Sequence, residues 1–229
     1  MFHQDQRLNR IFRRVFRKDI SPNLNKPEEH GLESSKQLYQ YKTVLLGESA
    51  VGKSCLAVRF VKEFFNPYEE STVGAAFLSK TLYFPKFNVK LDIWDTAGAE
   101  NYHVIAPLYY KRANAVILVY DITNRESFEK IHYWIRELRM ANSVTTVALV
   151  GNKSDMDVER SVEYEEGLDL AKSWGYLFFE TSAKTGCSVD VVFDSLARKL
   201  TMYKENFEDE DTEKEHLKIS QGCCCCKLF

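Results

Sequence analysis

The residues best suited to chemistry in this sequence form a glycine-rich loop, Gly47-Glu48-Ser49-Ala50-Val51-Gly52-Lys53-Ser54. An apolar run precedes this G-x-x-x-x-G-K-S pattern and a helical pattern follows it, which is the setting of a phosphate-binding loop. Glycines let the backbone wrap around phosphate oxygens, and the N–H groups at the start of the helix attract their charge. In that role Lys53 reaches the β- and γ-phosphates and the Ser54 hydroxyl holds Mg²⁺. A chance match to an ordinary strand, turn and helix becomes negligible beside the further motifs.

A second polar group follows the expected strand that ends at Trp94. Asp95 comes directly after that strand and begins an Asp-x-x-Gly pattern that ends at Gly98. Because ligands of such sheets bind at the carboxyl ends of the strands, Asp95 is placed to hold Mg²⁺ through water. The N–H of Gly98 can approach a γ-phosphate, since glycine has no side chain to intervene. Taken alone, these residues also fit a plain turn after a buried strand.

Two further motifs predict which base is bound. Asn152-Lys153-Ser154-Asp155 follows another apolar run, and Thr181-Ser182-Ala183-Lys184 follows the last expected strand. The Asp155 carboxylate can accept hydrogen bonds from N1–H and the 2-amino group of guanine, whereas adenine would leave it unpaired. We expect Lys153 to lie over the base, Asn152 to tie the loop to its neighbours, and the Ala183 N–H to meet O6 of guanine. Either motif alone also occurs by chance in loops.

These motifs need a scaffold of alternating strands and helices. Strands are expected at 40–46, 75–84, 88–94, 115–121, 146–151 and 176–181, and helices at 53–64, 101–111, 125–141, 163–174 and 188–203. The short turn at Pro85-Lys86-Phe87-Asn88 makes the second and third strands antiparallel, and the remaining alternation implies parallel strands with right-handed crossovers. The predicted fold is therefore α/β, with a six-stranded, mostly parallel sheet that has one antiparallel strand and helices on both faces.

The chain divides by composition into three parts. Residues 1–38 form an N-terminal extension with a helix and a linker, 39–203 form the globular domain, and 204–229 form a flexible acidic tail that ends in cysteines. In the extension, apolar residues recur with a helical period opposite the basic ones: Leu8, Ile11, Phe12, Val15 and Phe16. A basic amphipathic helix suits a membrane surface, a partner or its own domain, while a mobile extension and a mitochondrial transit peptide are alternatives.

The composition argues against several other classes of protein. A net charge of -2 provides no bulk basic surface for nucleic acid. No apolar run approaches the roughly 18–20 residues that span a bilayer, and the N-terminus lacks the apolar core of a secretory signal. The six cysteines, four of them at Cys223–Cys226, form no disulfide framework. We therefore expect a cytosolic or cytosol-facing protein.

With five motifs in a fixed order, the segment 39–203 resembles the Ras superfamily of small GTPases. The additional motif is Thr72, which matches the threonine that coordinates Mg²⁺ and senses the γ-phosphate in that family. The resemblance implies a P-loop G domain that binds GTP or GDP with Mg²⁺, the metal being held by Ser54, Thr72 and, through water, Asp95. Lys53, Thr72 and Gly98 are the implied catalytic residues. The implied nucleotide-binding residues are Ser49, Ala50, Val51, Gly52, Lys53, Ser54, Cys55, Phe65, Thr72, Gly98, Asn152, Lys153, Asp155, Ser182, Ala183 and Lys184.

The runs Trp94-Asp95-Thr96-Ala97-Gly98, Tyr109-Tyr110 and Tyr120-Asp121-Ile122-Thr123 are similar to those of Rabs, so within the superfamily the chain looks like a Rab. The segment 71–77 and the glycine-rich loop are most similar to the early-endosomal branch. Phe77, Trp94 and Tyr109 match the aromatic triad with which Rabs contact effectors, although such residues also form ordinary core or surface clusters. The resemblance implies a trafficking switch on the cytosolic face of an intracellular membrane, endosomal in this branch, with a cytosolic pool. Its partners would be an exchange factor, a GTPase-activating protein, a GDP-dissociation inhibitor or escort protein, and effectors.

The sequence departs from the family at one catalytic position. The family has Asp-Thr-Ala-Gly-Gln-Glu, and this chain has Ala99 in place of the glutamine. The missing carboxamide orients the water that attacks the γ-phosphate, so intrinsic hydrolysis is expected to be very slow. Activating proteins of the Rab family that supply an arginine and a glutamine leave assisted hydrolysis open, and Glu100 is another candidate substitute. The alternative function is a near-constitutively GTP-bound interaction module.

The sequence ends in four cysteines followed by Lys227-Leu228-Phe229. Rabs carry two geranylgeranyl groups on paired terminal cysteines, which implies Cys225 and Cys226 as the lipidated residues. Cys226 also begins a C-a-a-X box with Phe in the last position, although Lys is a poor aliphatic residue. Stable anchoring takes two signals, and the cysteines allow two prenyl groups or one prenyl and one palmitoyl group. An unmodified or metal-binding cysteine run is the alternative.

Overall fold

The computed structural model describes residues 36–98, 105–141 and 146–202. The chain separates into two units, Met1–Ser35 and Lys36–Phe229, and all the described residues belong to the second. The expectations for the N-terminal helix, for Ala99 and Glu100 and for the terminal cysteines therefore lie outside the described residues.

The domain is built on a six-stranded sheet with the strand order β2-β3-β1-β4-β5-β6. The strands are β1 Gln37–Leu46, β2 Ala75–Tyr83, β3 Phe87–Thr96, β4 Ala115–Asp121, β5 Thr146–Asn152 and β6 Leu177–Glu180. Only β2 runs antiparallel to its neighbour β3, and a hydrogen bond of 2.9 Å from the Phe84 N–H to the Phe87 carbonyl closes the turn between them. The predicted α/β fold with one antiparallel strand is confirmed.

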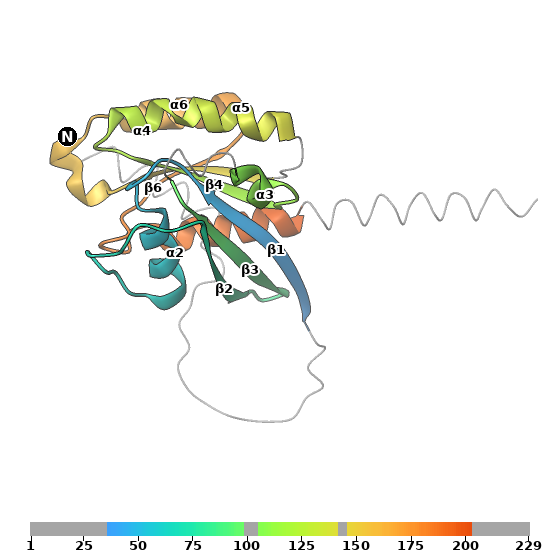
Figure 1. Cartoon of the computed structure of the whole chain (residues 1–229). Helices are drawn as coiled ribbons and strands as arrows, with labels where there is room; N and C mark the ends of the chain where they lie inside the picture. The colour runs from blue at the N-terminus through green and yellow to red at the C-terminus, as the bar shows by residue number, and fades with distance from the viewer. Residues whose placement is uncertain (1–35, 99–104, 142–145, 203–229) are drawn as a thin grey trace, which may run out of the picture. The chain divides into compact units, whose positions relative to one another are not determined.

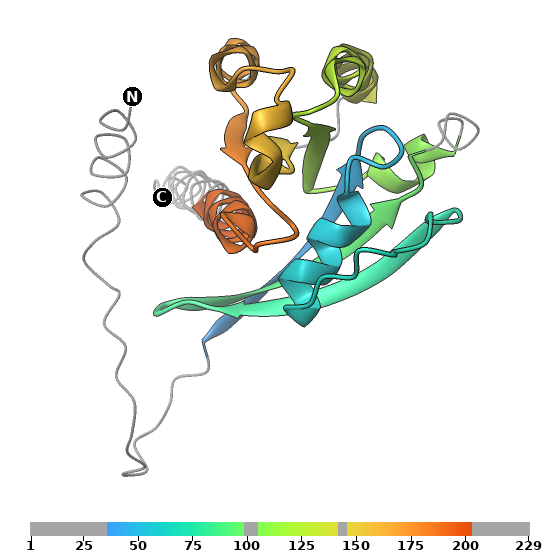
Figure 2. The ribbon, with the colours of Figure 1, turned by 90° about the vertical axis from the view of Figure 1, so that its left-hand side faces the viewer.

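Helices cover both faces of the sheet (Figures 1 and 2). They are α2 Lys53–Lys62, α3 Ala106–Tyr110, α4 Arg125–Glu129, α5 Ile131–Ala141 and α6 Tyr164–Trp174, and residues 189–202 are also helical. Helix α2 and residues 189–202 pack on one face, while α3, α4, α5 and α6 pack on the other. Among the described residues, no helix combines the length and the apolar character that crossing a bilayer requires.

Alternating side chains of the central strands build two separate cores. On β4, Ile117 and Val119 belong to the core under α2, whereas Val116 and Leu118 belong to the core under α5. All four are almost fully buried, as strands covered by helices on both faces must be. The sheet is therefore rigid in its centre, and the carboxyl ends of its five parallel strands share one edge.

The elements differ from the expected ones at several boundaries, and three of the differences are informative. Strand β1 begins at Gln37, because it pairs with β3 along its whole length down to Phe87. The helix expected at 125–141 is divided into two helices, α4 and α5. The division occurs at Lys130, whose carbonyl accepts a 3₁₀-type hydrogen bond of 3.0 Å from the Tyr133 N–H, three residues further along the chain. A 3₁₀ helix at Ser154–Glu159 was not expected. The difference at β1 lies at an element boundary, where periodicity carries least information, whereas the break between α4 and α5 lies inside an expected helix and the 3₁₀ helix is an additional element.

Candidate nucleotide-binding site

The glycine-rich loop curls around the amine of Lys53 between β1 and α2. Lys53 is buried, and its Nζ donates hydrogen bonds to the carbonyls of Gly47 (2.9 Å) and Glu48 (2.7 Å). Helix α2 starts at Lys53 after Gly52, whose φ of 93° is left-handed, and its first turn contains no acidic residue. A side chain at Gly52 would collide with the Asn152 amide. The loop therefore presents a positively polarised helix start and a buried cation at one point, which suits a phosphate.

The buried amine of Lys53 lacks full charge compensation from the protein. Burial lowers the pKa of Lys53 to about 8, although the charges of Asp95 and Glu48 oppose the effect. Phosphate oxygens beside the amine would supply the missing negative charge and raise this pKa again. The amine is therefore matched to a polyanionic ligand.

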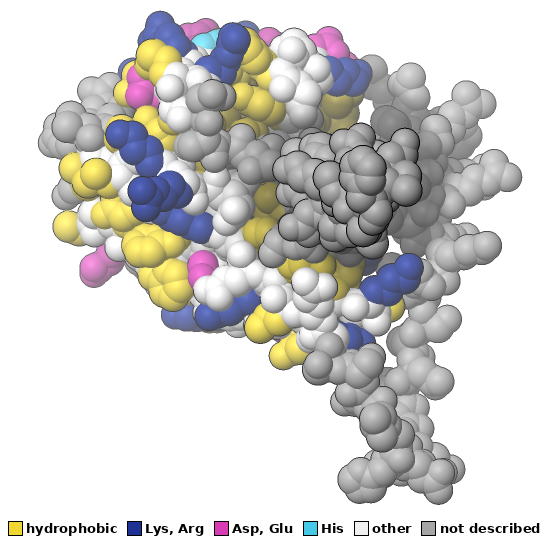
Figure 3. Space-filling view, turned by 90° about the vertical axis from the view of Figure 1, so that its right-hand side faces the viewer, with side chains coloured by type: hydrophobic (Ala, Val, Ile, Leu, Met, Phe, Trp, Pro, Cys, Tyr) yellow, Lys and Arg dark blue, Asp and Glu magenta, His cyan; other side chains and the backbone are white. Residues whose placement is uncertain are grey.

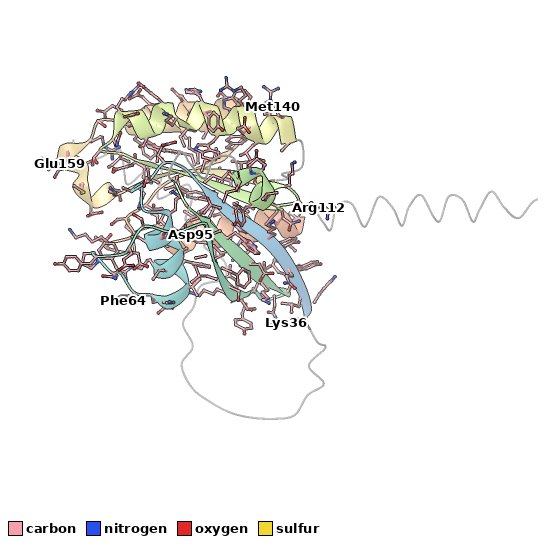
Figure 4. The ribbon with its side chains drawn as sticks, viewed as in Figure 1. Lys36, Phe64, Asp95, Arg112, Met140 and Glu159 are labelled. Atoms are coloured by element: carbon pink, nitrogen blue, oxygen red, sulfur yellow. The ribbon has the colours of Figure 1, made fainter. Side chains whose placement is uncertain are left out.

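Three oxygen-bearing side chains converge beside the amine. The hydroxyl oxygens of Ser54 and Thr72 lie 2.7 Å apart, and the Thr72 hydroxyl donates to Asp95 Oδ2 at 3.1 Å. Asp95 lies at the end of β3 beside α2 (Figure 4), and its other oxygen is buried without a hydrogen-bond partner among the described residues. Burial raises the pKa of Asp95, and the Ser54 and Thr72 hydroxyls and Lys53 only partly offset it.

This oxygen set fits Mg²⁺. Neighbouring ligands of an octahedral site with bonds of 2.0–2.1 Å lie about 2.9 Å apart, close to the separation of the Ser54 and Thr72 oxygens. Hydroxyl and carboxylate oxygens are also the ligands that Mg²⁺ prefers. When bound, the metal would neutralise phosphate charge and keep Asp95 ionised. The structure thus brings together Ser54, Thr72 and Asp95, and their binding of a metal stays a prediction.

Gly98 closes the site from the side of β3. A Cβ on Gly98 would lie 2.4 Å from Lys53 Nζ and 2.5 Å from the Glu48 carbonyl oxygen, so only glycine fits there. One residue earlier, the Ala97 N–H donates to the Gly74 carbonyl at 2.9 Å. The end of β3 and the loop of Thr72 are therefore held together directly beside the phosphate loop.

Asn152 joins the phosphate loop to the loops that follow β5 and β6. Its Nδ2 donates to the Val51 carbonyl at 2.9 Å, and its Oδ1 accepts from the Thr181 hydroxyl at 3.3 Å and from the Ala183 N–H at 3.2 Å. The side chain is almost completely buried. Asn152 thus ties the loop to its neighbours as expected, whereas the Ala183 N–H, expected to face guanine, is directed at Asn152.

The carboxylate of Asp155 is held by the motif after β6. Its Oδ1 accepts a hydrogen bond of 2.5 Å from the Ser182 hydroxyl, which in turn accepts the Thr185 N–H at 3.0 Å. Its Oδ2 lies 3.7 Å from the Lys184 amine, whose side chain is largely exposed. Ser182 therefore orients the carboxylate, and Oδ2 keeps acceptor capacity for the edge of a guanine base.

Sequence reasoning missed two residues that position the predicted base-binding loops. Asp121, at the end of β4, binds Lys153 Nζ at 2.6 Å through Oδ2, and its Oδ1 accepts the N–H and hydroxyl of Thr123 at 2.9 and 2.8 Å. Arg59 on α2 donates to the carbonyls of Ala183 (2.7 Å) and Lys184 (2.6 Å). Asp121 was detectable as a polar residue at a strand's carboxyl end, but Arg59 had no local signal.

The remaining predicted nucleotide residues lie on or near α2 without a defined ligand contact. Ser49 and Ala50 are exposed at the loop tip, and Ala50 has a left-handed φ of 61°. The half-buried Cys55 belongs to α2, and burial raises the pKa of its thiol. Phe65 packs against the core under α2, with the Arg59 guanidinium 6.0 Å from its ring.

The three aromatic residues predicted to contact effectors form one cluster. The ring centroids of Phe77 and Trp94 are 5.3 Å apart, and those of Trp94 and Tyr109 are 5.8 Å apart. The rings come from β2, β3 and α3, and Phe77 is 54% exposed. Lys42 Nζ lies 5.5 Å from the Trp94 ring. The cluster therefore forms a continuous aromatic surface across three elements.

The fold and the site define a P-loop α/β nucleotide-binding domain in which hydroxyl and carboxylate side chains form a candidate metal centre. A model of the Ras family matches residues 42–202, more than two thirds of the chain. This chain belongs to the Ras family. It is therefore a small GTPase of the switch type, a class that binds GTP and GDP with Mg²⁺ and acts with exchange factors, GTPase-activating proteins and effectors.

Proposed function

We propose that this chain is a Rab-like switch in vesicular membrane trafficking that recruits effectors when GTP is bound. The observation that carries the proposal is the position of the aromatic cluster. Trp94 directly precedes Asp95, and Phe77 lies five residues after Thr72, so two cluster residues adjoin the two sensors of metal and phosphate. A change in the bound nucleotide would therefore alter the exposed aromatic surface.

The switch would turn off slowly without help. Lys53 and the helix start bind and orient the phosphates, but Ala99 offers no group to orient an attacking water. An activating protein that supplies an arginine and a glutamine would complete the reaction. The cycle would then be timed by that partner.

Single-turnover hydrolysis tests the role of Ala99. We expect Ala99→Gln to raise the intrinsic rate about tenfold or more, because a carboxamide can orient the water. Ala141→Gln, on α5 and outside the site, is the matched control and should leave the rate unchanged. An unchanged rate in Ala99→Gln would show that another group already does this work.

A second candidate function follows from the same substitution. With hydrolysis slow enough, the chain would be a near-constitutively GTP-bound interaction module controlled by expression or membrane delivery. The nucleotide that co-purifies with the protein separates the two functions. Mostly GDP supports a cycling switch, and persistent GTP supports the module.

Membrane attachment is the second half of the proposal. Cys225 and Cys226 are proposed to carry prenyl groups, which a GDP-dissociation inhibitor or escort protein would cover in the cytosolic pool. The membrane is proposed to be endosomal, on its cytosolic face. The acidic tail offers no polybasic second signal, so the basic helix of residues 1–20 is proposed to supply one. Mass spectrometry of the C-terminus, and membrane retention after deletion of residues 1–20, test these two points.

A further inference from the structure

A groove lies between α5 and α6, away from the nucleotide site. Its volume is about 390 Å³, and none of the predicted nucleotide-binding residues lines it. It is lined by His132, Ile135, Arg136, Arg139, Met140 and Trp174. Figure 3 shows basic and hydrophobic side chains next to each other along the upper edge of the molecule, where these helices lie. The groove is large enough for several side chains of a peptide.

Two arginines of the groove are held by aromatic rings instead of by acids. The Arg139 guanidinium lies 4.9 Å from the centre of the Trp174 ring, and that of Arg136 lies 5.9 Å from the Tyr133 ring. Within the described part of the chain, neither arginine forms an ion pair or a hydrogen bond. Arg125 and Arg160, in contrast, each bind a glutamate at 2.6–2.7 Å. A stacked guanidinium keeps its N–H donors free at its edges, so the groove offers two sites for carboxylates.

Between the arginines the groove is apolar. Ile135 is buried, whereas Met140 and Trp174 are exposed, at 67% and 37%. Its chemistry therefore matches an acidic segment that also has apolar side chains, and it disfavours a basic one.

We propose that the acidic segment 208–215 of this same chain docks in the groove. The segment, Glu208-Asp209-Glu210-Asp211-Thr212-Glu213-Lys214-Glu215, has six acids and one base, and Phe207 and Leu217 flank it with apolar side chains. It begins six residues after the last described residue, so its effective concentration at the groove is in the millimolar range. The contact joins two parts of one chain and does not depend on the proposed trafficking role.

The length of the connecting chain sets how far the segment can reach. The helix of residues 189–202 and α5 both end on the right-hand side of the domain in Figure 1, where Met140 is labelled in Figure 4. Residues 203–207 connect this helix to the segment and span up to about 17 Å when extended, and the eight residues of the segment itself span up to about a further 26 Å. Docking would hold the segment before the terminal cysteines against the domain and shorten the reach of a lipid anchor.

Nuclear magnetic resonance of the full-length, GDP-loaded protein tests the contact. In the wild type, backbone amides of 208–215 should differ from random-coil shifts and show positive heteronuclear NOEs. The double variant Arg136→Gln/Arg139→Gln should return them to random-coil values, as should about 0.5 M salt, because screening weakens exposed charge pairs. The control Arg112→Gln removes another exposed arginine (Figure 4), outside the groove, and should have no effect.

A reciprocal measurement keeps the test valid if the arginine variant folds poorly. Neutralising the segment with Glu208→Gln, Asp209→Asn, Glu210→Gln and Asp211→Asn should shift the amides of α5 around Arg136 and leave those of α2 in place. Random-coil tail amides in the wild type would overturn the proposal. So would loss of binding to phosphatidylserine vesicles in the arginine variant with unchanged tail amides, which would assign the groove to a membrane surface.

Discussion

Lys53 is a single residue whose charged form is destabilised by burial in the binding site. The amine satisfies its donors with loop carbonyls, which are weaker partners than the phosphate oxygens for which the loop is shaped. The protein therefore holds the Lys53 amine where its positive charge is only partly balanced, and the negative charge of the phosphates would balance the rest.

Proton uptake on nucleotide binding measures this effect. The pKa of Lys53 is about 8 in the protein, below its usual value of 10.5, so about half of these amines are neutral at pH 8. Binding of GDP raises this pKa, and the protein should take up about half a proton per site at pH 8. Calorimetry in buffers of different ionisation enthalpy gives the number of protons taken up per GDP bound. No uptake at this pH would show that the amine is already charged before binding.

Asp121 is a positioning residue that acts through Lys153. Asp121→Asn removes the charge that holds the Lys153 amine at 2.6 Å, so fluorescent GDP should dissociate about tenfold faster, equivalent to about 1.4 kcal/mol. Asp157→Asn is the control. Its carboxylate also binds a cation, Arg160 at 2.8 Å, but is 73% exposed and contributes little. Equal GDP dissociation rates for both variants would show that Asp121 does not contribute to nucleotide binding.

At the scale of elements, α6 lies unusually close to the sheet. A Cβ at Gly167 would come within 2.4 Å of the Tyr120 hydroxyl and 2.6 Å of the Phe178 ring, so the glycine allows this approach. The Tyr120 ring packs edge-on against Phe128 at 4.9 Å. Its buried hydroxyl has no hydrogen-bond partner among the described residues, and burial raises its pKa. The packing of α4 and α6 on β4 thus has an unfavourable polar group at its centre.

Removing that hydroxyl should not destabilise the protein. We expect Tyr120→Phe to leave the free energy of unfolding unchanged or to raise it by about 1 kcal/mol, because a desolvation cost disappears while the ring contacts stay. Denaturant unfolding of the GDP-loaded protein measures this. Phe128→Ala, which removes the ring contact instead, should cost about 3–5 kcal/mol. A loss above about 1 kcal/mol in Tyr120→Phe would reveal a hydrogen bond, for example through water.

Most elements could be predicted because their signals are local. The buried strands β4 and β5 are continuous apolar runs, and the turn at Pro85 fixes the one antiparallel pair. The break between α4 and α5 was missed, since both helices bury residues in the same core and their apolar pattern continues through Lys130. The 3₁₀ helix Ser154–Glu159 was missed because six residues with none buried have no period to read.

At the scale of the whole molecule, the site joins residues that are far apart in the sequence. Its motifs were predictable because four of the five each follow one parallel strand, and parallel strands bring their carboxyl ends to one edge, whereas Thr72 lies in the loop before β2. The pairs Asp121–Lys153 and Arg59–Ala183 were not predictable, since their residues lie 32 and 124 positions apart in the sequence and no local pattern links them. The same reason applies to the groove, where Arg139 meets Trp174.

The aromatic cluster should carry partner recognition for the whole domain. Phe77→Ala removes the most exposed ring of the cluster, and we expect at least about tenfold weaker binding of proteins retained only by the chain loaded with a non-hydrolysable GTP analogue. Tyr83→Ala, at the other end of β2 and 79% exposed, is the control and should bind normally. If both variants bind partners as the wild type does, the cluster is not the recognition surface.

The hydrogen bonds of Asn152 have a thermodynamic consequence. One buried side chain holds the phosphate loop, the end of β5 and the loop after β6, so the groups that position the nucleotide also hold the sheet edge together. A ligand that binds only this arrangement adds its binding free energy to that of folding, about 4 kcal/mol at a thousand times its Kd. Release of the nucleotide therefore lowers the free energy of unfolding of the domain until a new nucleotide binds. An exchange factor would have to stabilise the nucleotide-free domain during that interval.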